Sequence, residues 1–259
     1  MRPPIIKLQH VSITLGEYQA LNDVSLQIPP GTCVGIIGPN GSGKTTLLRT
    51  ILGLIKPTSG KIEVMGTIPT RRNRQAQQIG YVPQIRRIDR DFPVTVSDVV
   101  MQGRVGRLGL FHRPGPKDRG IVKTCLEKVG INDLAGKQIG ALSGGQQQRA
   151  FIARALAQES SLLLLDEPAT GLDIPTQQSI YELLEELHQE GVTTLTTTHD
   201  LLALDFHHFG YIACINKGLV AFGPPQQILT PEILSKTFSG FPIPLSKAWE
   251  KTDSLGGLQ

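Results

Sequence analysis

The segment at residues 38–45 constrains this chain more than any other part of its sequence. It reads Gly-Pro-Asn-Gly-Ser-Gly-Lys-Thr and matches the pattern G-x-x-x-x-G-K-[ST]. A continuous apolar run at residues 33–38 leads into it, as expected for a buried strand, and a helical pattern at residues 45–54 follows it. Glycines let the backbone wrap closely, so that successive N–H groups point at phosphate groups. Together, the strand, the loop and the helix predict a site for a nucleoside triphosphate.

Two side chains at the end of this segment carry the expected chemistry. Lys44 supplies a positive charge to the β- and γ-phosphates, and the Thr45 hydroxyl can ligate Mg²⁺. The helix that begins near Thr45 adds the positive end of its dipole. The nucleotide contacts expected from this segment are Gly38, Pro39, Asn40, Gly41, Ser42, Gly43, Lys44, Thr45 and Thr46.

A second chemical signal is an apolar run at residues 162–165 that ends in Asp166 and Glu167. In parallel sheets, ligand chemistry gathers at the carboxyl ends of the strands. Asp166 is therefore expected to hold Mg²⁺ through water, and Glu167 to polarise an attacking water molecule. The run alone would mark only the end of a strand, but beside a phosphate loop it predicts hydrolysis.

Strand and helix patterns alternate along most of the chain, which predicts an α/β fold with a mainly parallel sheet covered by helices. A helical stretch at about residues 92–142 interrupts this alternation and is interpreted as an insertion. We expect one domain over residues 1–241 and a loosely ordered tail over residues 242–259.

Composition excludes several classes of protein. The chain has 259 residues, of which 39% are hydrophobic, enough to bury a core. The apolar runs fall far short of the ~20 residues that a membrane helix needs, and the N-terminal residues do not resemble a signal peptide. The three cysteines, Cys33, Cys125 and Cys214, are odd in number and widely separated, which favours reduced thiols. These features predict a soluble cytoplasmic chain.

The segment Leu-Ser-Gly-Gly-Gln at residues 142–146 resembles the signature motif of ATP-binding cassette (ABC) ATPases. It begins 98 residues after Lys44 and ends 20 residues before Asp166. The resemblance covers nearly the whole chain. It implies the ABC ATPase core of the P-loop NTPases, with an antiparallel β part at the N-terminus and an inserted α-helical subdomain.

The resemblance also implies roles for residues that would mean little alone. Tyr18 matches the aromatic residue that stacks on adenine, and Gln84 the glutamine that contacts Mg²⁺ and the attacking water. His199 matches the histidine that contacts the γ-phosphate, and Asp173 an acid in the shared dimer interface. Ala169, where the family often has serine, is a mild departure. The implied catalytic set is Glu167, His199, Gln84 and Lys44; the Mg²⁺ set is Thr45, Gln84 and Asp166; the signature contacts are Ser143, Gly144, Gly145 and Gln146.

Partners follow from the same resemblance. Two subunits would pack head to tail as a homodimer, each ATP lying between the phosphate loop of one chain and the signature motif of the other. Integral-membrane permease subunits and an extracytoplasmic substrate-binding protein would complete a transporter. The chain would then lie on the cytoplasmic side of the inner membrane, held there through the permease.

The sequence lacks features that functions other than transport would need. A GTPase switch would need N-K-x-D, and residues 216–219 lack the final aspartate. Soluble ABC ATPases that organise chromosomes carry long coiled coils between the phosphate loop and the signature, for which 98 residues leave no room. Relatives that act in translation usually carry two cassettes, and this chain has one. The transporter interpretation is therefore preferred.

The charge of residues 68–123 bears on the permease partner, and the similarity of residues 91–104 to known importer ATPases bears on the transported substrate. Residues 68–123 carry twelve basic and four acidic side chains, a local charge of +8 in a chain of net charge +4. This is either a solvated face or a docking side for the permease, and scarce aromatic residues argue against nucleic acid. Residues 91–104 are similar to the same stretch in ATPases of manganese, zinc and iron importers. Importers of ferric siderophores or cobalamin are the alternative.

Overall fold

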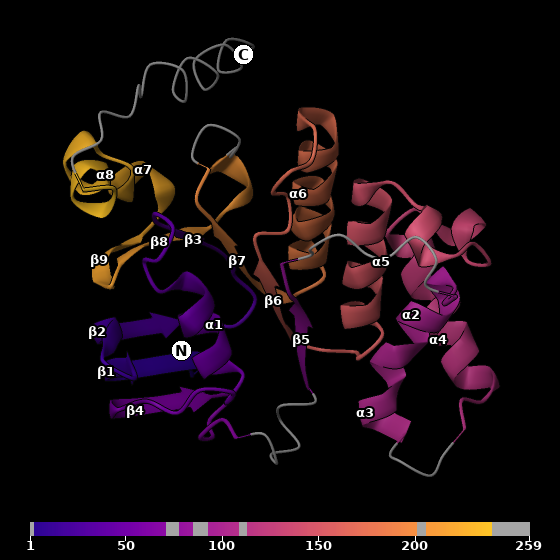
Figure 1. Ribbon diagram of the computed structural model, residues 1–259, viewed down its shortest axis with the longest axis horizontal. Helices are drawn as coiled ribbons and strands as arrows, with labels where there is room; N and C mark the ends of the chain where they lie inside the picture. Colours follow the sequence, from indigo (N-terminus) through magenta and orange to yellow (C-terminus); the bar gives the residue numbers. More distant parts are fainter. Residues whose placement is uncertain (1–2, 71–77, 85–92, 109–112, 201–205, 240–259) are drawn as a thin grey trace.

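A six-stranded sheet forms the centre of the computed structural model, which describes residues 3–70, 78–84, 93–108, 113–200 and 206–239 (Figure 1). The strand order is β5-β6-β7-β3-β8-β9, parallel except for β9, which pairs antiparallel with β8. Its strands are β3 (Cys33–Ile37), β5 (Ile79–Val82), β6 (Leu162–Asp166), β7 (Thr193–Thr198), β8 (Tyr211–Asn216) and β9 (Gly218–Gly223). β3, β6 and β7 are buried along their whole lengths, as expected for strands covered on both faces.

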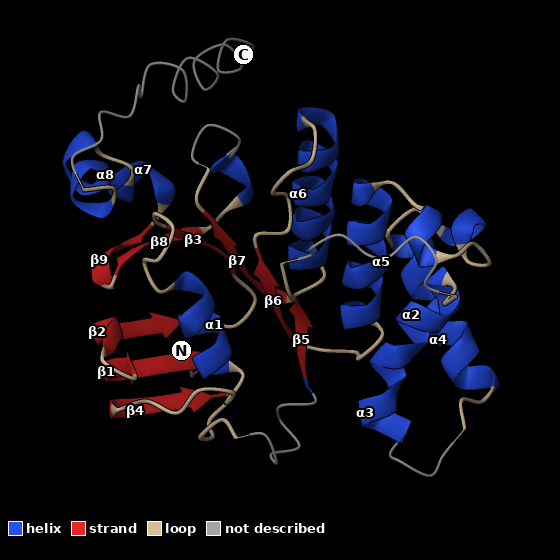
Figure 2. Ribbon diagram, in the orientation of Figure 1, coloured by secondary structure: helices blue, strands red, loops and turns tan. Residues whose placement is uncertain are grey.

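A second sheet contains three antiparallel strands near the N-terminus (Figure 2). Its order is β2-β1-β4, from β1 (Ile6–Leu15), β2 (Tyr18–Ile28) and β4 (Ser59–Val64). Buried side chains of this sheet, such as Leu21 and Val24, share one core with helix α1 (Lys44–Ile51) and with β3. The antiparallel N-terminal part is thereby confirmed, although the strand at residues 18–28 was not predicted from the sequence.

The helices of the predicted insertion lie at one end of the central sheet, beyond β5 and α5 in Figure 1. They are α2 (Val96–Met101), η2 (Gln102–Arg104), α3 (Val105–Leu108), α4 (Pro116–Lys128), η3 (Asn132–Leu134) and η4 (Ile139–Ala141). Val122 and Leu126 bury the inner face of α4, and Gly130 ends that region with a positive φ of 69°. The inserted helical part of the fold is confirmed; the domain boundaries at residues 92, 142 and 241 stay predictions.

Arg104 joins three segments at the base of these helices. Its side chain is buried, and Nε donates to Asp118 Oδ1 over 3.1 Å. Nη1 donates to Glu159 Oε2 and to the Ala157 carbonyl, each over 2.7 Å. This residue therefore does not belong to a basic surface, because partners within the fold neutralise its charge. The basic residues at positions 71, 72, 74, 86, 87 and 90 lie outside the described part of the chain.

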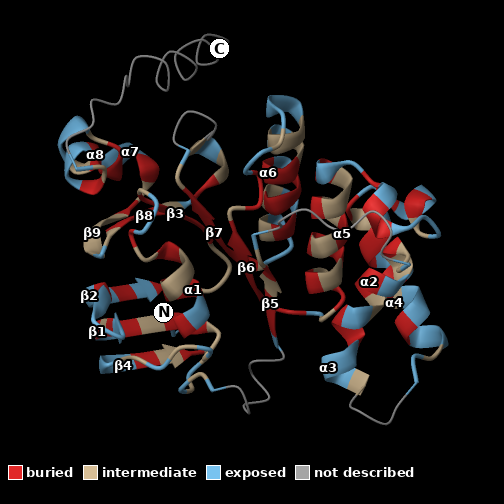
Figure 3. Cartoon of the chain, viewed as in Figure 1, coloured by how far each residue is buried: buried red, intermediate tan, exposed pale blue. Residues whose placement is uncertain are grey.

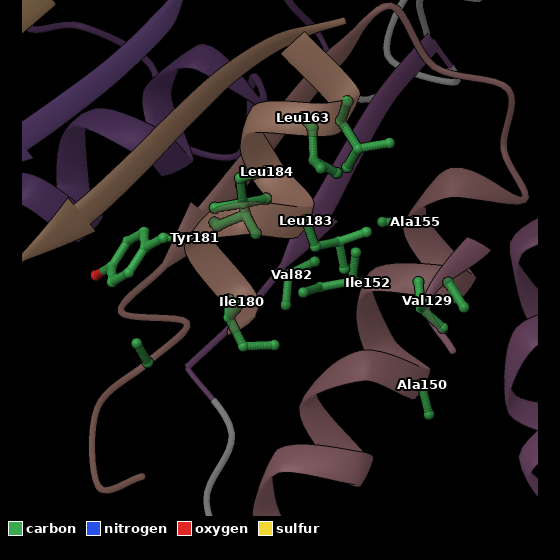
Figure 4. Close-up of a cluster of buried hydrophobic side chains, with 14 of the residues drawn as sticks. Val82, Val129, Ala150, Ile152, Ala155, Leu163, Ile180, Tyr181, Leu183 and Leu184 are labelled. Atoms are coloured by element: carbon green, nitrogen blue, oxygen red, sulfur yellow. The ribbon is translucent and has the colours of Figure 1, made fainter. Parts of the chain in front are cut away.

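Helices α5 (Gly144–Leu156) and α6 (Ile174–Gln189) follow the insertion and cover one face of the sheet. Figure 4 shows Ile152 of α5 near Leu183 of α6 and Val82 of β5, within one apolar core. Figure 3 shows buried residues concentrated on the sheet and on the helix faces turned toward it. η5 (Phe206–His208), α7 (Pro225–Ile228) and α8 (Pro231–Thr237) complete the described chain. Strand β9 and helices α7 and α8 were not predicted.

Candidate functional site

The phosphate loop connects β3 to α1, and close packing requires two of its glycines, Gly38 and Gly43. Gly43 has a φ of 102°, and a Cβ there would lie 2.4 Å from Leu21 Cδ2. A Cβ on Gly38 would lie 2.1 Å from the Ile215 carbonyl oxygen. These distances are shorter than van der Waals contact, so neither position accepts a side chain without movement of its neighbours. The loop is therefore fixed by its contacts with β2 and β8.

Lys44 is buried beneath this loop, with 5% of its surface exposed. Its Nζ donates to the carbonyl oxygens of Gly38 over 2.8 Å and of Pro39 over 3.0 Å. Burial lowers the pKa of Lys44, while the negative charges of Glu167 and Asp166 act in the opposite direction. The ammonium group thus lies inside the loop, where an anion bound by the loop would meet it.

A cleft of about 430 Å³ opens over the loop. Tyr18 stands at its edge, 48% exposed, and its hydroxyl donates to the Gly41 carbonyl over 3.0 Å. The cleft is lined by Tyr18, Ala20, Asn40, Gly41, Ser42, Gly43, Lys44, Thr45, Thr46, Gln84, Glu167, Thr170 and His199. The structure thus brings most of the predicted nucleotide contacts together with all four of the predicted catalytic residues.

The acid pair lies at the carboxyl end of β6, as predicted. Asp166 is 3% exposed, and its Oδ1 accepts from the Thr45 hydroxyl over 3.1 Å and from the Thr197 hydroxyl over 2.7 Å. Glu167 follows with a φ of 51°, a left-handed conformation that is rare for residues other than glycine. This turn sends the two carboxylates in different directions.

The Glu167 carboxylate lies between the two side chains that the resemblance paired with it. Gln84 Nε2 donates to Glu167 Oε2 over 2.8 Å, and His199 Nδ1 lies 2.9 Å from Glu167 Oε1. Gln84 follows β5 and His199 follows β7, the two strands that flank β6 in the sheet. Because carboxyl ends of parallel strands share one edge, these three side chains converge at the mouth of the phosphate cleft.

The signature residues and Asp173 occupy helix N-termini outside the phosphate cleft of the same chain. Ser143 caps α5: its Oγ accepts from the Gln146 amide, and Gln146 Oε1 accepts from the Ser143 amide over 3.0 Å. Asp173 caps α6 by accepting from the Thr176 amide over 2.9 Å, and hydrogen bonds from the Thr176 hydroxyl and amide lower the pKa of the Asp173 carboxyl. Any nucleotide contact by these residues would require a second subunit, so their binding role stays a prediction.

Sequence reasoning missed two residues of this region. Lys217 lies in the β8–β9 turn with its Nζ 5.2 Å from the centre of the Tyr18 ring, a cation–π contact. Thr197 contacts both members of the acid pair. Neither position carried a sequence signal, because each contact depends on how strands distant in the chain pair.

A buried lysine in a glycine-rich loop, with an acid pair on a nearby parallel strand, defines a P-loop nucleoside triphosphatase. Comparison with known proteins narrows this class. The ABC transporter family matches residues 21–170. A manganese transport system ATP-binding protein of Halalkalibacterium halodurans is 45% identical over 92% of this chain and 93% of that protein. A chelated-iron transport system protein of Yersinia pestis is 41% identical over 93% of this chain and 80% of that protein.

Solved structures agree with this assignment. A metal-chelate type ABC transporter in an inward-facing conformation matches with a TM-score of 0.80 at 30% identity, covering 91% of this chain and 89% of that one. The chain belongs to the ABC transporter family and is an ATP-hydrolysing subunit of a transporter. In the described part of the chain, no helix combines the length and apolarity needed to cross a membrane.

Proposed function

We propose that this subunit hydrolyses ATP to power the import of a transition-metal cation, with manganese, zinc and iron as the candidates. The proposal for the cargo is supported by relatives named for these metals. Besides the two proteins above, a manganese transport ATP-binding protein of Synechocystis is 40% identical over 96% of this chain and 95% of that protein. A zinc transport ATP-binding protein of Treponema pallidum is 38% identical over 91% of this chain and 87% of that protein.

The observation that supports the hydrolytic mechanism best is the placement of Glu167 between Gln84 and His199, beside the phosphate loop. In this mechanism Glu167 polarises the attacking water as general base. Gln84 orients the Glu167 carboxylate and the water, and His199 holds the other carboxylate oxygen and contacts the γ-phosphate. Lys44 exchanges its loop carbonyls for phosphate oxygens when ATP enters.

The residues present fit a Mg²⁺ ion. Asp166 is a buried carboxylate whose hydrogen-bond donors Thr45 and Thr197 are both uncharged, so no basic side chain among the described residues bonds to it. Carboxylate, hydroxyl and amide oxygens are the ligands that Mg²⁺ prefers. Thr45, Gln84 and Asp166 would hold the ion, Asp166 through water. Bound there with ATP, Mg²⁺ would neutralise the charge that develops on the phosphates.

The proposed assembly is a homodimer of this subunit bound to integral-membrane permease subunits. ATP would lie between the phosphate loop of one chain and Ser143 and Gly145 of its partner, at the N-terminus of the partner's α5, where backbone N–H groups favour an anion. A dimeric ATP-binding cassette solved with ADP and phosphate supports the proposed dimer; it is 30% identical with a TM-score of 0.71, covering 85% of this chain and 98% of that one. An extracytoplasmic substrate-binding protein would deliver the cargo, and the ATPase would lie on the cytoplasmic side of the inner membrane.

Metal uptake in a strain deleted for this subunit tests the proposal. Uptake of radioactive manganese, zinc and iron is measured one ion at a time, with the wild-type subunit, Glu167→Gln or Glu186→Gln restored. Glu186 is exposed on α6 and provides the matched control. Wild type and the control should restore uptake of at least one ion, whereas Glu167→Gln should not. Normal uptake of all three ions in the deletion strain would contradict the proposal.

The alternative cargo is a metal chelate, a ferric siderophore or a cobalamin. It is favoured by the match to the metal-chelate type transporter. In that case the deletion would abolish uptake of the labelled chelate and leave uptake of the free ions unchanged.

A further inference from the structure

One hydroxyl group, that of Thr197, contacts both carboxylate residues at the end of β6. Thr197 lies opposite Asp166 in the parallel β6–β7 pairing and is fully buried. Its Oγ1 donates to Asp166 Oδ1 over 2.7 Å and accepts from the Glu167 backbone amide over 3.0 Å. The hydroxyl proton is committed to Asp166, which leaves a lone pair for the Glu167 N–H.

The contact with Glu167 falls at a strained position. Glu167 has a φ of 51°, and residues with side chains adopt this region only when surrounding contacts hold them there. The turn directs the Glu167 side chain toward Gln84 and His199 while Asp166 faces Thr45. By accepting a hydrogen bond from the Glu167 amide, Thr197 Oγ1 holds the Glu167 backbone in this conformation.

Neighbouring threonines of β7 do not share this role. The Thr196 hydroxyl is buried without a hydrogen-bond partner among the described residues. The Thr194 hydroxyl donates to Cys33 Sγ over 3.1 Å. A hydroxyl is therefore not required at every position of β7, and that of Thr197 has contacts its neighbours lack.

We propose that Thr197 is a positioning residue for ATP hydrolysis: its hydroxyl sets Asp166 and Glu167 relative to each other. The proposal rests on the catalytic role of Glu167 proposed above. A valine at position 197 has nearly the same shape but offers neither a proton nor a lone pair. It would leave the Glu167 amide without its acceptor and Asp166 with one donor fewer.

The test compares Thr197→Val, Thr197→Ser and the control Thr196→Val in the full-length chain, at concentrations that allow dimers to form. Thr197→Val should lower kcat at least about 10-fold, because small displacements of catalytic groups cost this much or more. Its KM for ATP should stay within about 3-fold of wild type, since the phosphate loop is unchanged. Thr197→Ser should restore most of kcat, and Thr196→Val should leave kcat unchanged without lowering thermal stability, because the Thr196 hydroxyl has no hydrogen bond to lose among the described residues.

Two further measurements separate positioning from a structural role. In an ATP-binding titration, Thr197→Val should require more Mg²⁺ for half-saturation, because Asp166 is one of the proposed ligands. In a Glu167→Gln background, Thr197→Val should cause little further loss of kcat, because both changes act on one group. If the valine variant does not fold, Thr197→Ala removes the same hydroxyl and carries the same expectations.

Wild-type kcat in Thr197→Val would overturn the proposal. An equal loss of kcat in Thr197→Val and Thr196→Val, or a serine variant as inactive as the valine variant, would assign β7 a structural role only. Wild-type turnover in Glu167→Gln would instead overturn the proposed role of Glu167, and with it the reason for positioning that residue.

Discussion

Replacing Arg104 by methionine should destabilise the chain by about 3 kcal/mol. The guanidinium is buried and bonds to Asp118, Glu159 and the Ala157 carbonyl. Breaking a buried ion pair from one side costs about 3–5 kcal/mol, because the partner charge stays buried. The lower end of this range applies to Arg104, because the Glu159 side chain is 51% exposed and can be solvated by water. Asp118 also keeps its hydrogen bond from the Gly115 amide.

Thermal unfolding followed by circular dichroism measures this effect. For a chain of this size 1 kcal/mol corresponds to about 2–4 °C, so Arg104→Met should lower Tm by about 6–12 °C. Arg107→Met is the matched control: Arg107 lies in the same region and bonds backbone carbonyls, but it is exposed. It should lower Tm by no more than about 2–4 °C.

The pH dependence of the Tm difference between wild type and Arg104→Met provides a second check. The hydrogen bond and charge of Arg104 hold the pKa of Glu159 below its usual value of 4.5. A carboxyl with a lowered pKa in the folded state stabilises the fold above its unfolded pKa, and the contribution is lost as pH falls through the folded value. The Tm difference between wild type and Arg104→Met should therefore shrink below about pH 4.5. Equal Tm values for Arg104→Met and Arg107→Met at pH 7 would refute the reasoning.

Three predictions concern the nucleotide site. Glu167→Gln should lower kcat, measured by phosphate release, by about 10²–10⁴-fold, and it should trap an ATP-bound dimer that size-exclusion chromatography detects. Glu186→Gln is the control, and wild-type turnover in Glu167→Gln would contradict the prediction. Lys44→Ala should abolish ATP binding measured by calorimetry, whereas Lys236→Ala, an exposed change on α8, should not; unchanged affinity in both would count against the loop assignment. Tyr18→Ala should weaken ATP binding by about 5–150-fold, equivalent to 1–3 kcal/mol of stacking, and Tyr18→Phe should weaken it much less. Equal ATP affinities of Tyr18→Ala and wild type would exclude stacking.

The parts of the site that could be predicted from sequence are those whose geometry is local. The phosphate loop needs glycines at fixed offsets, and a positive φ at Gly43 is a property of that one residue. The acid pair follows its strand directly, so Asp166 and Glu167 could be placed at the carboxyl edge of the sheet without knowledge of its neighbours. Gln84 and His199 could be assigned only through the family resemblance, because residue spacing does not specify the strand order β5-β6-β7 that joins them.

The parts that could not be predicted depend on tertiary contacts. Arg104 looked like one more member of a basic stretch, and only the packing of α4 against the end of α5 shows that it is buried. Thr197 lies in a run of threonines on β7, and only the pairing of β7 with β6 shows that it lies opposite Asp166. Strand β2 alternates regularly only from Val24 to Ile28; before that, Ala20 and Leu21 are both buried and the next two residues are both exposed. Its partner β1 contains register shifts that accommodate this irregular pattern.

The turn between β8 and β9 links the two ends of the nucleotide cleft. The Lys217 amide donates to the Ser42 carbonyl over 2.8 Å, and the Lys217 carbonyl accepts from the Asn22 amide over 2.6 Å. Ser42 belongs to the phosphate loop, and Asn22 lies on β2, the strand that begins at Tyr18. One backbone residue thus fixes the spacing between the phosphate end and the base end of the cleft. ATP meets a site shaped during folding, so association should lose little additional backbone entropy.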